Sequence, residues 1–275
     1  MTPLLSVDDF RGLEGDVVVL DARPSPDAYA EGHVAGARHA DLDTQLSGAR
    51  DEGADPARGG RHPLPRLARW LEQLGSWGIT PSTTVVVYDD QSGANAAARA
   101  WWMLRAVGHE KVAVLDGDFR SLGLTTEMPS IAPQKPYPAP AWQRPVVSMD
   151  EVDALRNDPE WKVLDVRATP RFRGETEPID PIAGHIPGAV NLPFAENLTA
   201  GRYKSADELR AQYERLLAGT RPDHLVVHCG SGVTACHTLL ALEAAGMEGA
   251  ALYVGSWSEW CRNDDRPRGT GDGER

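Results

Sequence analysis

The sequence predicts an α/β protein made of two domains in tandem, each a mainly parallel sheet flanked by helices. Its length of 275 residues leaves room for two domains at about 150 residues each. Short motifs occur twice along the chain in the same order. Continuous apolar strands alternate with amphipathic helices, and this alternation is typical of parallel sheets that are buried on both faces.

The first two motifs of the repeat are a strand and a turn. Residues 17–23 read VVVLDAR and residues 161–167 read WKVLDVR, so each predicted strand ends in Asp-x-Arg. The string GHVAGA at 32–37 returns as GHIPGA at 184–189. Because the order is kept and only the loop lengths change, we interpret the chain as a duplicated domain.

The remaining elements follow the same plan in both copies. Apolar strands at 85–88 and 225–228 each lead into a loop of small residues and then into an apolar helix. The strings VLDGDF at 114–119 and LYVGSW at 252–257 form the last pair. In the first copy, residues 64–74 place four apolar side chains on one face, which predicts an amphipathic helix.

A proline-rich stretch separates the two copies. Residues 127–145 contain prolines at positions 129, 133, 136, 138, 140 and 145. Because proline lacks an N–H donor and restricts φ, we expect an extended linker here. The predicted domains are therefore residues 1–126 and 146–275. We expect the tail from Asp264 to be disordered.

Composition restricts the classes of function. Hydrophobic residues make up 41% and charged residues 25% of the chain, as in ordinary globular proteins. A net charge of −12 opposes binding to nucleic acid or to an anionic membrane. No apolar run approaches the roughly 18 residues of a membrane span. Three cysteines and no basic, apolar leader favour a cytoplasmic location, and two packed domains suffice for a monomer.

Cys229 is the strongest candidate for a reactive residue. It lies where a buried strand ends, in the loop CGSGVT at 229–234, just before an apolar helix. Such a strand–loop–helix turn directs backbone N–H groups and the positive end of a helix toward one point, which stabilises a thiolate. The alternative is a buried cysteine that acts only as a small hydrophobe. In the first copy the corresponding position is Asp90, so one loop looks reactive and the other looks like its inactive counterpart.

Three motifs in order resemble the rhodanese family of sulfurtransferases, in particular its two-domain members. They are GHIPGA at 184–189, the Cys229 loop, and YVGSWSEW at 253–260. The resemblance implies tandem rhodanese-like domains, the first inactive and the second catalytic. It also implies that Cys229 takes a sulfur atom from a small-molecule donor as a persulfide and passes it to a thiophilic acceptor such as cyanide or a thiol. This chemistry requires neither cofactor nor metal.

The resemblance also assigns the site residues. It gives catalytic roles to Cys229, Ser231, Thr234 and His33, and substrate contacts to Arg171, Gly230, Gly232 and Val233. In this assignment His33 relays protons with Ser231, whereas the alternative is that His33 and His185 each close a turn of their own copy. Asp165 and Arg167 are expected to brace the loops as a local ion pair. The segment 61–65 resembles a first-domain segment of the family, with no evident role.

The motifs specify the reaction, but they leave the sulfur donor open. The loop is similar to that of members that use 3-mercaptopyruvate, because Gly230 and Ser231 carry no charge. Those members have a second arginine where this chain has Asp180, so Arg173 or another group substitutes, carboxylate binding is weaker, or the donor is thiosulfate. A non-catalytic persulfide carrier or binding module is a further alternative. A cysteine phosphatase is disfavoured, because the arginine it needs is replaced by Ala235.

Overall fold

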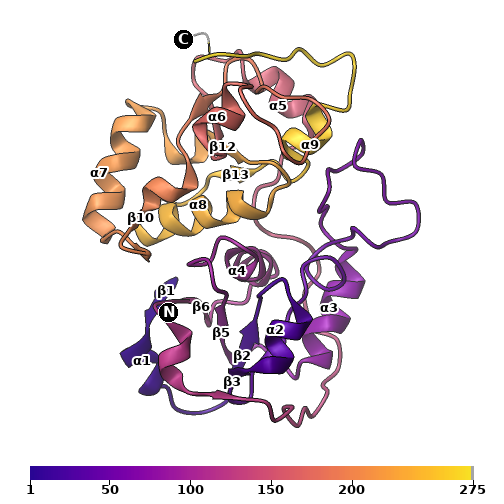
Figure 1. Cartoon of the computed structure of the whole chain (residues 1–275), viewed down its shortest axis with the longest axis vertical. Helices are drawn as coiled ribbons and strands as arrows, with labels where there is room; N and C mark the ends of the chain where they lie inside the picture. Colours follow the sequence, from indigo (N-terminus) through magenta and orange to yellow (C-terminus); the bar gives the residue numbers. More distant parts are fainter. Residues whose placement is uncertain (274–275) are drawn as a thin grey trace. The chain divides into compact units, whose positions relative to one another are not determined.

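Each half of the chain forms a parallel sheet, as the sequence predicts. A computed structural model describes residues 1–273, which divide into two units (Figure 1). The first unit contains Met1–Arg50 and Pro65–Arg144, and the second contains Asp51–Leu64 and the chain from Pro145 onward. The segment 51–64 therefore belongs to the second unit, although it lies in the first half of the sequence.

The first unit is built on a five-stranded sheet. Its strand order is β1-β6-β5-β2-β4, and every pairing is parallel. The strands are β1 (Leu4–Ser6), β2 (Val17–Asp21), β4 (Arg38–His39), β5 (Thr84–Tyr88) and β6 (Val112–Asp116), and a small antiparallel pair is formed by β3 (His33–Val34) and β7 (Leu124–Thr125). The helices are α1 (Val7–Arg11), α2 (Pro26–Glu31), α3 (Leu67–Ser76), α4 (Ala97–Ala106) and the 3-10 turn Phe119–Leu122.

The amphipathic helix predicted from residue 64 begins three residues later, at Leu67. Pro65 disfavours helical backbone at Leu64, and Arg66 at the N-cap is extended with ψ 136°. The predicted apolar face is correct, because Trp70 and Leu74 are fully buried.

The second unit repeats the plan with a four-stranded sheet. Its order is β13-β12-β8-β9, again with parallel pairings. The strands are β8 (Lys162–Asp165), β9 (Val190–Asn191), β12 (Leu225–His228) and β13 (Ala251–Leu252), and β10 (Leu198–Thr199) pairs antiparallel with β11 (Arg202–Tyr203). The helices are α5 (Met149–Leu155), α6 (Thr169–Phe172), α7 (Ala206–Leu217), α8 (Val233–Ala244), α9 (Ser256–Trp260) and the 3-10 turns Phe194–Asn197 and Pro222–His224.

The Asp-x-Arg motif forms the same buried ion pair in both units. Arg23 Nη2 lies 2.6 Å from Asp21 Oδ2, and Arg167 Nη2 lies 2.5 Å from Asp165 Oδ2. Each arginine also donates to the carbonyl of the glycine that opens the Gly-His turn, Gly32 at 2.7 Å and Gly184 at 2.8 Å. The expected bracing role of Asp165 and Arg167 agrees with these contacts.

The prediction of a disordered tail is wrong for residues 264–273, and residues 274–275 lie outside the described part. Arg266 forms an ion pair with Asp153 at 2.7 Å, and the indole N–H of Trp260 donates to the Pro267 carbonyl at 2.8 Å. Gly269 and His185 exchange two backbone hydrogen bonds of 2.9 Å. These contacts offset the conformational entropy that the tail loses on ordering. Among the described helices, none combines the length and apolar character that crossing a bilayer demands.

A buried histidine makes the stability of the first unit depend on pH. His109 is 1% exposed, and burial lowers its pKa to about 4. The unfolded chain binds a proton at His109 near pH 6.5, whereas the folded chain does not. The free energy of unfolding is therefore highest above that pH and falls as the pH drops toward 4. His109→Leu should remove about 3 kcal/mol of this acid destabilisation. Urea unfolding at pH 7 and pH 4.5 measures it, and an equal pH slope in both proteins would contradict it.

Candidate active site

Cys229 follows the last residue of β12 and precedes α8. Its side chain is 2% exposed. Gly232, the N-cap of α8, has φ +75°, and a Cβ there would lie 2.4 Å from the Val254 carbonyl oxygen. Only glycine fits this turn, which brings the loop backbone against the segment before α9.

The start of α9 holds the Cys229 loop by backbone contacts. The Trp257 N–H donates to the Cys229 carbonyl at 3.0 Å, and the Ser258 N–H donates to the Gly230 carbonyl at 2.9 Å. The Cys229 N–H donates to Ser256 Oγ at 3.1 Å, and this hydroxyl donates to the Tyr253 carbonyl at 2.9 Å. The motif YVGSWSEW therefore fixes the loop, which explains why the two motifs occur together.

Ser231 contacts a histidine that the sequence did not single out. His62 Nδ1 lies 2.9 Å from Ser231 Oγ, and Ser231 is 7% exposed. His62 belongs to segment 51–64, whose backbone is fixed to α9. The Gly59 N–H donates to Glu259 Oε1 at 2.7 Å, and the Arg61 N–H donates to Ser258 Oγ at 3.0 Å. The string RHPLP at 61–65 was a signal for this contact, but the sequence offered no way to place it against a loop about 170 residues away.

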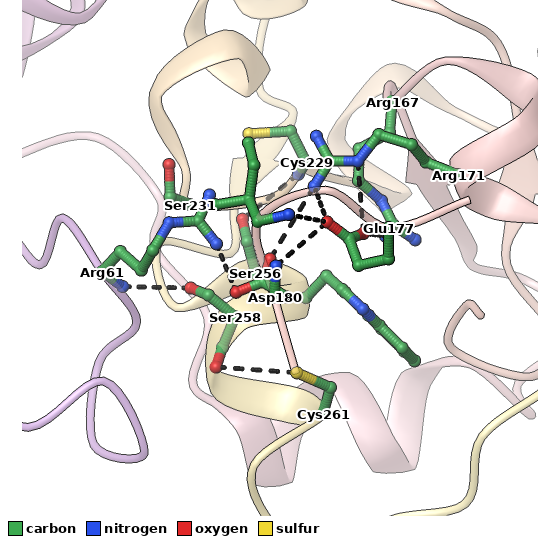
Figure 2. A network of polar contacts seen from close by, with 12 residues as sticks. Arg61, Arg167, Arg171, Glu177, Asp180, Cys229, Ser231, Ser256, Ser258 and Cys261 are labelled. Atoms are coloured by element: carbon green, nitrogen blue, oxygen red, sulfur yellow. Dashed lines mark hydrogen bonds and ion pairs between the residues drawn. The ribbon is translucent and has the colours of Figure 1, made fainter. Parts of the chain in front are cut away.

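Arg171, the predicted carboxylate-binding residue, lies beside the loop. A Cβ at Gly230 would lie 3.4 Å from Arg171 Nη2 and 3.2 Å from Arg61 Nη2. Glu177 orients Arg171 through contacts of 2.6 Å and 3.2 Å, and it also lies 3.3 Å from Arg167 Nη1. Figure 2 shows these side chains around Cys229. The loop has no charge of its own, but two guanidinium groups stand next to it.

Burial and charge set the protonation of the groups below the loop. Burial lowers the pKa of His228, so this ring is neutral at pH 7, although Asp165 opposes the shift. Burial would also raise the pKa of Asp165, but the Arg167 guanidinium outweighs it and holds the net pKa below its usual range. The structure thus has an ionised Asp165–Arg167 pair, with the neutral His228 ring 3.9 Å from the Asp165 carboxylate.

The other predicted residues have more ordinary surroundings. Val233 is the first residue of α8 and is 6% exposed, and Thr234 follows it in the first turn. Cys236 is fully buried with its thiol 3.3 Å from the Gly232 carbonyl, as expected for a packing residue. Cys261 is also buried, and its thiol lies 3.9 Å from Arg262 Nη1.

His33 belongs to the first unit and is fully buried there. Its Nδ1 lies 2.9 Å from the Tyr29 carbonyl and its Nε2 lies 3.1 Å from the Glu127 carbonyl. The ring stacks on Tyr29 at 4.0 Å, as His185 stacks on Phe172 at the same distance in the second unit. These duplicated contacts fit a turn-closing role for both histidines, and a catalytic role for His33 stays a prediction.

The loop of the first unit that corresponds to the Cys229 loop holds a carboxylate. Asp89 is 6% exposed and accepts five backbone N–H groups at 2.8 to 3.1 Å, from Gln91, Gly93, Asn95, Ala96 and Ala97. The turn between strand and helix is therefore an anion-binding cradle in this fold. Tyr88, the last residue of β5, pairs with Asp21, just as His228, the last residue of β12, pairs with Asp165. This register places Asp89 at the position of Cys229, whereas the sequence predicted Asp90 there. The carboxylate of the first unit and the thiol of the second therefore occupy equivalent positions.

Comparison with known proteins agrees with this architecture. The family model described as "Rhodanese-like domain" matches twice, at residues 7–123 and 148–263. The chain belongs to the rhodanese family. Among its relatives, "Probable 3-mercaptopyruvate sulfurtransferase" of Pseudomonas aeruginosa is 43% identical over 273 residues, covering 94% of each chain. "Thiosulfate sulfurtransferase" of Bos taurus is 37% identical, covering 84% of this rhodanese chain and 78% of its own length.

A solved structure shows the same fold. The 3-mercaptopyruvate sulfurtransferase from Leishmania major superimposes with a TM-score of 0.79 at 29% identity, covering 94% of this rhodanese chain and 73% of the other. The predicted family and fold class are therefore confirmed.

Proposed function

We propose that this protein is a sulfurtransferase that moves sulfur from 3-mercaptopyruvate, through a persulfide on Cys229, to a thiophilic acceptor. The observation that carries the proposal is the Cys229 loop itself: Gly230 lies beside Arg61 and Arg171, and Ser231 contacts His62 of segment 51–64. Relatives named as 3-mercaptopyruvate sulfurtransferases support the donor.

The reaction has two half-reactions. The Cys229 thiolate attacks the donor's sulfur, so an S–S bond forms while the donor's C–S bond breaks and its electron pair stays on carbon. The resulting enolate of pyruvate takes up one proton, and the enzyme holds the persulfide. An acceptor thiolate or cyanide then attacks the outer sulfur and releases the Cys229 thiolate. In both steps the loop amides stabilise a sulfur anion.

Each neighbouring side chain has a separate part in this scheme. The Arg171 guanidinium binds the donor carboxylate, because a planar guanidinium matches a carboxylate in shape and charge. Gly230 leaves the space in which that carboxylate lies. Ser231 and His62 form a hydrogen-bonded pair that supplies the proton to the pyruvate enolate. The first domain has Asp89 at the position of the cysteine, so it has no thiol there and is non-catalytic.

Steady-state sulfur transfer with 3-mercaptopyruvate and thiosulfate side by side tests the proposal. We expect a higher kcat/KM for 3-mercaptopyruvate and an added mass of about 32 Da, one sulfur atom, on the donor-treated protein. Preference for thiosulfate would favour the alternative thiosulfate:cyanide activity. A stable adduct that no small acceptor removes would favour a carrier that hands sulfur to a protein. The predicted domain limits, monomeric state and cytoplasmic location stay predictions.

The His62–Ser231 pair should affect the rate of the chemical step more strongly than it affects binding of the donor. His62→Asn is expected to lower kcat about 100-fold, since general acid catalysis contributes about that much, with little change in KM. The pH profile of kcat should lose one limb in this variant. His224→Asn is the matched control, since His224 is a half-buried histidine of the same unit whose ring stacks on Trp161. An unchanged kcat in His62→Asn would remove the pair from the mechanism.

A further inference from the structure

Asp180 replaces the second arginine of related enzymes, and the structure shows what this carboxylate does. Its side chain is fully buried. Asp180 Oδ1 accepts a short hydrogen bond from Arg61 Nη1 and lies 2.9 Å from Arg262 Nη1. Its Oδ2 lies 3.8 Å from Arg171 Nη2 and has no hydrogen-bond partner within residues 1–273. Three guanidinium groups therefore lie within 3.8 Å of the Asp180 carboxylate, and Figure 2 labels two of them, those of Arg61 and Arg171.

Arg61 uses only part of its guanidinium in this contact. Nη1 binds Asp180, whereas Nη2 is the nearest atom to the position that a Cβ at Gly230 would take, at 3.2 Å. Arg171 is arranged similarly, with its Nε and Nη2 on Glu177 and both Nη atoms within 3.7 Å of the same position. The two side chains are 20% and 19% exposed. One edge of each guanidinium group therefore faces the small space beside Gly230, the residue that follows Cys229.

The other arginine that could substitute lies elsewhere. Arg173 binds Asp272 at 2.5 Å and lies 3.9 Å from Glu175. Its side chain is 42% exposed. It forms no contact with the Cys229 loop among the described residues, so it does not supply the missing charge.

We propose that Arg61 is the second donor-binding cation of this enzyme, and that Asp180 is the positioning residue that holds it beside Arg171. The guanidinium that related enzymes place at position 180 is here supplied from segment 51–64, and the Asp180 carboxylate forms an ion pair with it. This inference rests on the proposed function, and it identifies the ligand of Arg61 as the carboxylate of an α-keto acid donor.

The local charge favours a donor with one negative charge. The connected network contains four arginines, Arg61, Arg167, Arg171 and Arg262, and three carboxylates, Asp165, Glu177 and Asp180. One net positive charge remains, and the Cys229 thiolate balances it. Each further negative charge on the donor then has to be bound without a net countercharge, which disfavours the thiosulfate dianion relative to a monoanionic carboxylate.

Arg61→Met tests the inference in the full chain. We expect the KM for 3-mercaptopyruvate to rise about 10- to 100-fold while kcat changes little, because one charge-assisted hydrogen bond to the donor is lost. Arg173→Met is the matched control and should keep the original KM. Titration of pyruvate into the Cys229→Ala protein gives a binding readout without turnover, and Arg61→Met in that background should weaken pyruvate binding by a similar factor.

A charge reversal tests the role of Asp180. Arg61→Asp alone should weaken donor binding further, because two carboxylates then face each other. The double variant Arg61→Asp with Asp180→Arg restores the ion pair with its guanidinium at position 180, and most of the lost KM should return.

Three outcomes would overturn the inference. They are an unchanged KM in Arg61→Met, an equal rise in Arg173→Met, and a double variant no better than Arg61→Asp. Persulfide formation by the unaltered chain is measured first. Its absence would count against the proposed function, whereas its presence with an unchanged Arg61→Met would count against Arg61 alone.

Discussion

Replacing Cys229 with serine should lower sulfur transfer by more than about 1,000-fold, because the hydroxyl is far less nucleophilic than a thiolate and forms no persulfide. The protein should remain folded, since serine is close to cysteine in size and the loop is held by backbone contacts to α9. Its thermal unfolding temperature checks this. The donor-dependent mass increase of one sulfur atom should vanish together with the activity.

Cys236→Ser is the control for Cys229→Ser. Cys236 is also buried and follows the same loop, but its thiol points to the Gly232 carbonyl at 3.3 Å, and a serine hydroxyl can make the same contact. This variant should keep both the activity and the mass increase. Persulfide formation that disappears in Cys236→Ser but survives in Cys229→Ser would reverse the assignment of the nucleophile.

Asp89→Asn should destabilise the first unit by about 3–5 kcal/mol. The neutral amide keeps one acceptor oxygen, so two or three of the five N–H groups around residue 89 lose their partner, at about 1–3 kcal/mol each. Calorimetry should show a fall of more than about 10 °C in the transition of this unit.

Asp90→Asn is the control that separates the loss of the Asp89 hydrogen bonds from the loss of a negative charge. Asp90 neighbours Asp89 but is exposed, and its contact is with the Asn95 side chain at 2.6 Å. Its neutralisation should leave the transition unchanged. If both variants unfold at the same temperature, the five hydrogen bonds of Asp89 do not contribute to stability as argued.

The sequence was sufficient for the features that depend on local chemistry. The repeat of Asp-x-Arg and Gly-His motifs predicted two similar units, because the same residues make the same short-range contacts wherever they recur. Arg23 and Arg167 bind the carboxylate two residues before them, and His33 and His185 stack on the aromatic residue of the preceding helix. The Cys229 loop was also predictable, since a buried strand, small residues and an apolar helix are contiguous in the chain.

The tertiary structure alone decided which distant residues complete the site. Segment 51–64 was assigned to the first domain by sequence, yet its contacts belong to the second unit, where it places His62 against Ser231 and Arg61 against Asp180. From the sequence, Asp180 only marked the absence of an expected arginine, and its ion pair with Arg61 is visible only in the structure. Contacts over more than 100 residues depend on how packed elements bring side chains together, and no spacing or periodicity in the chain encodes that distance.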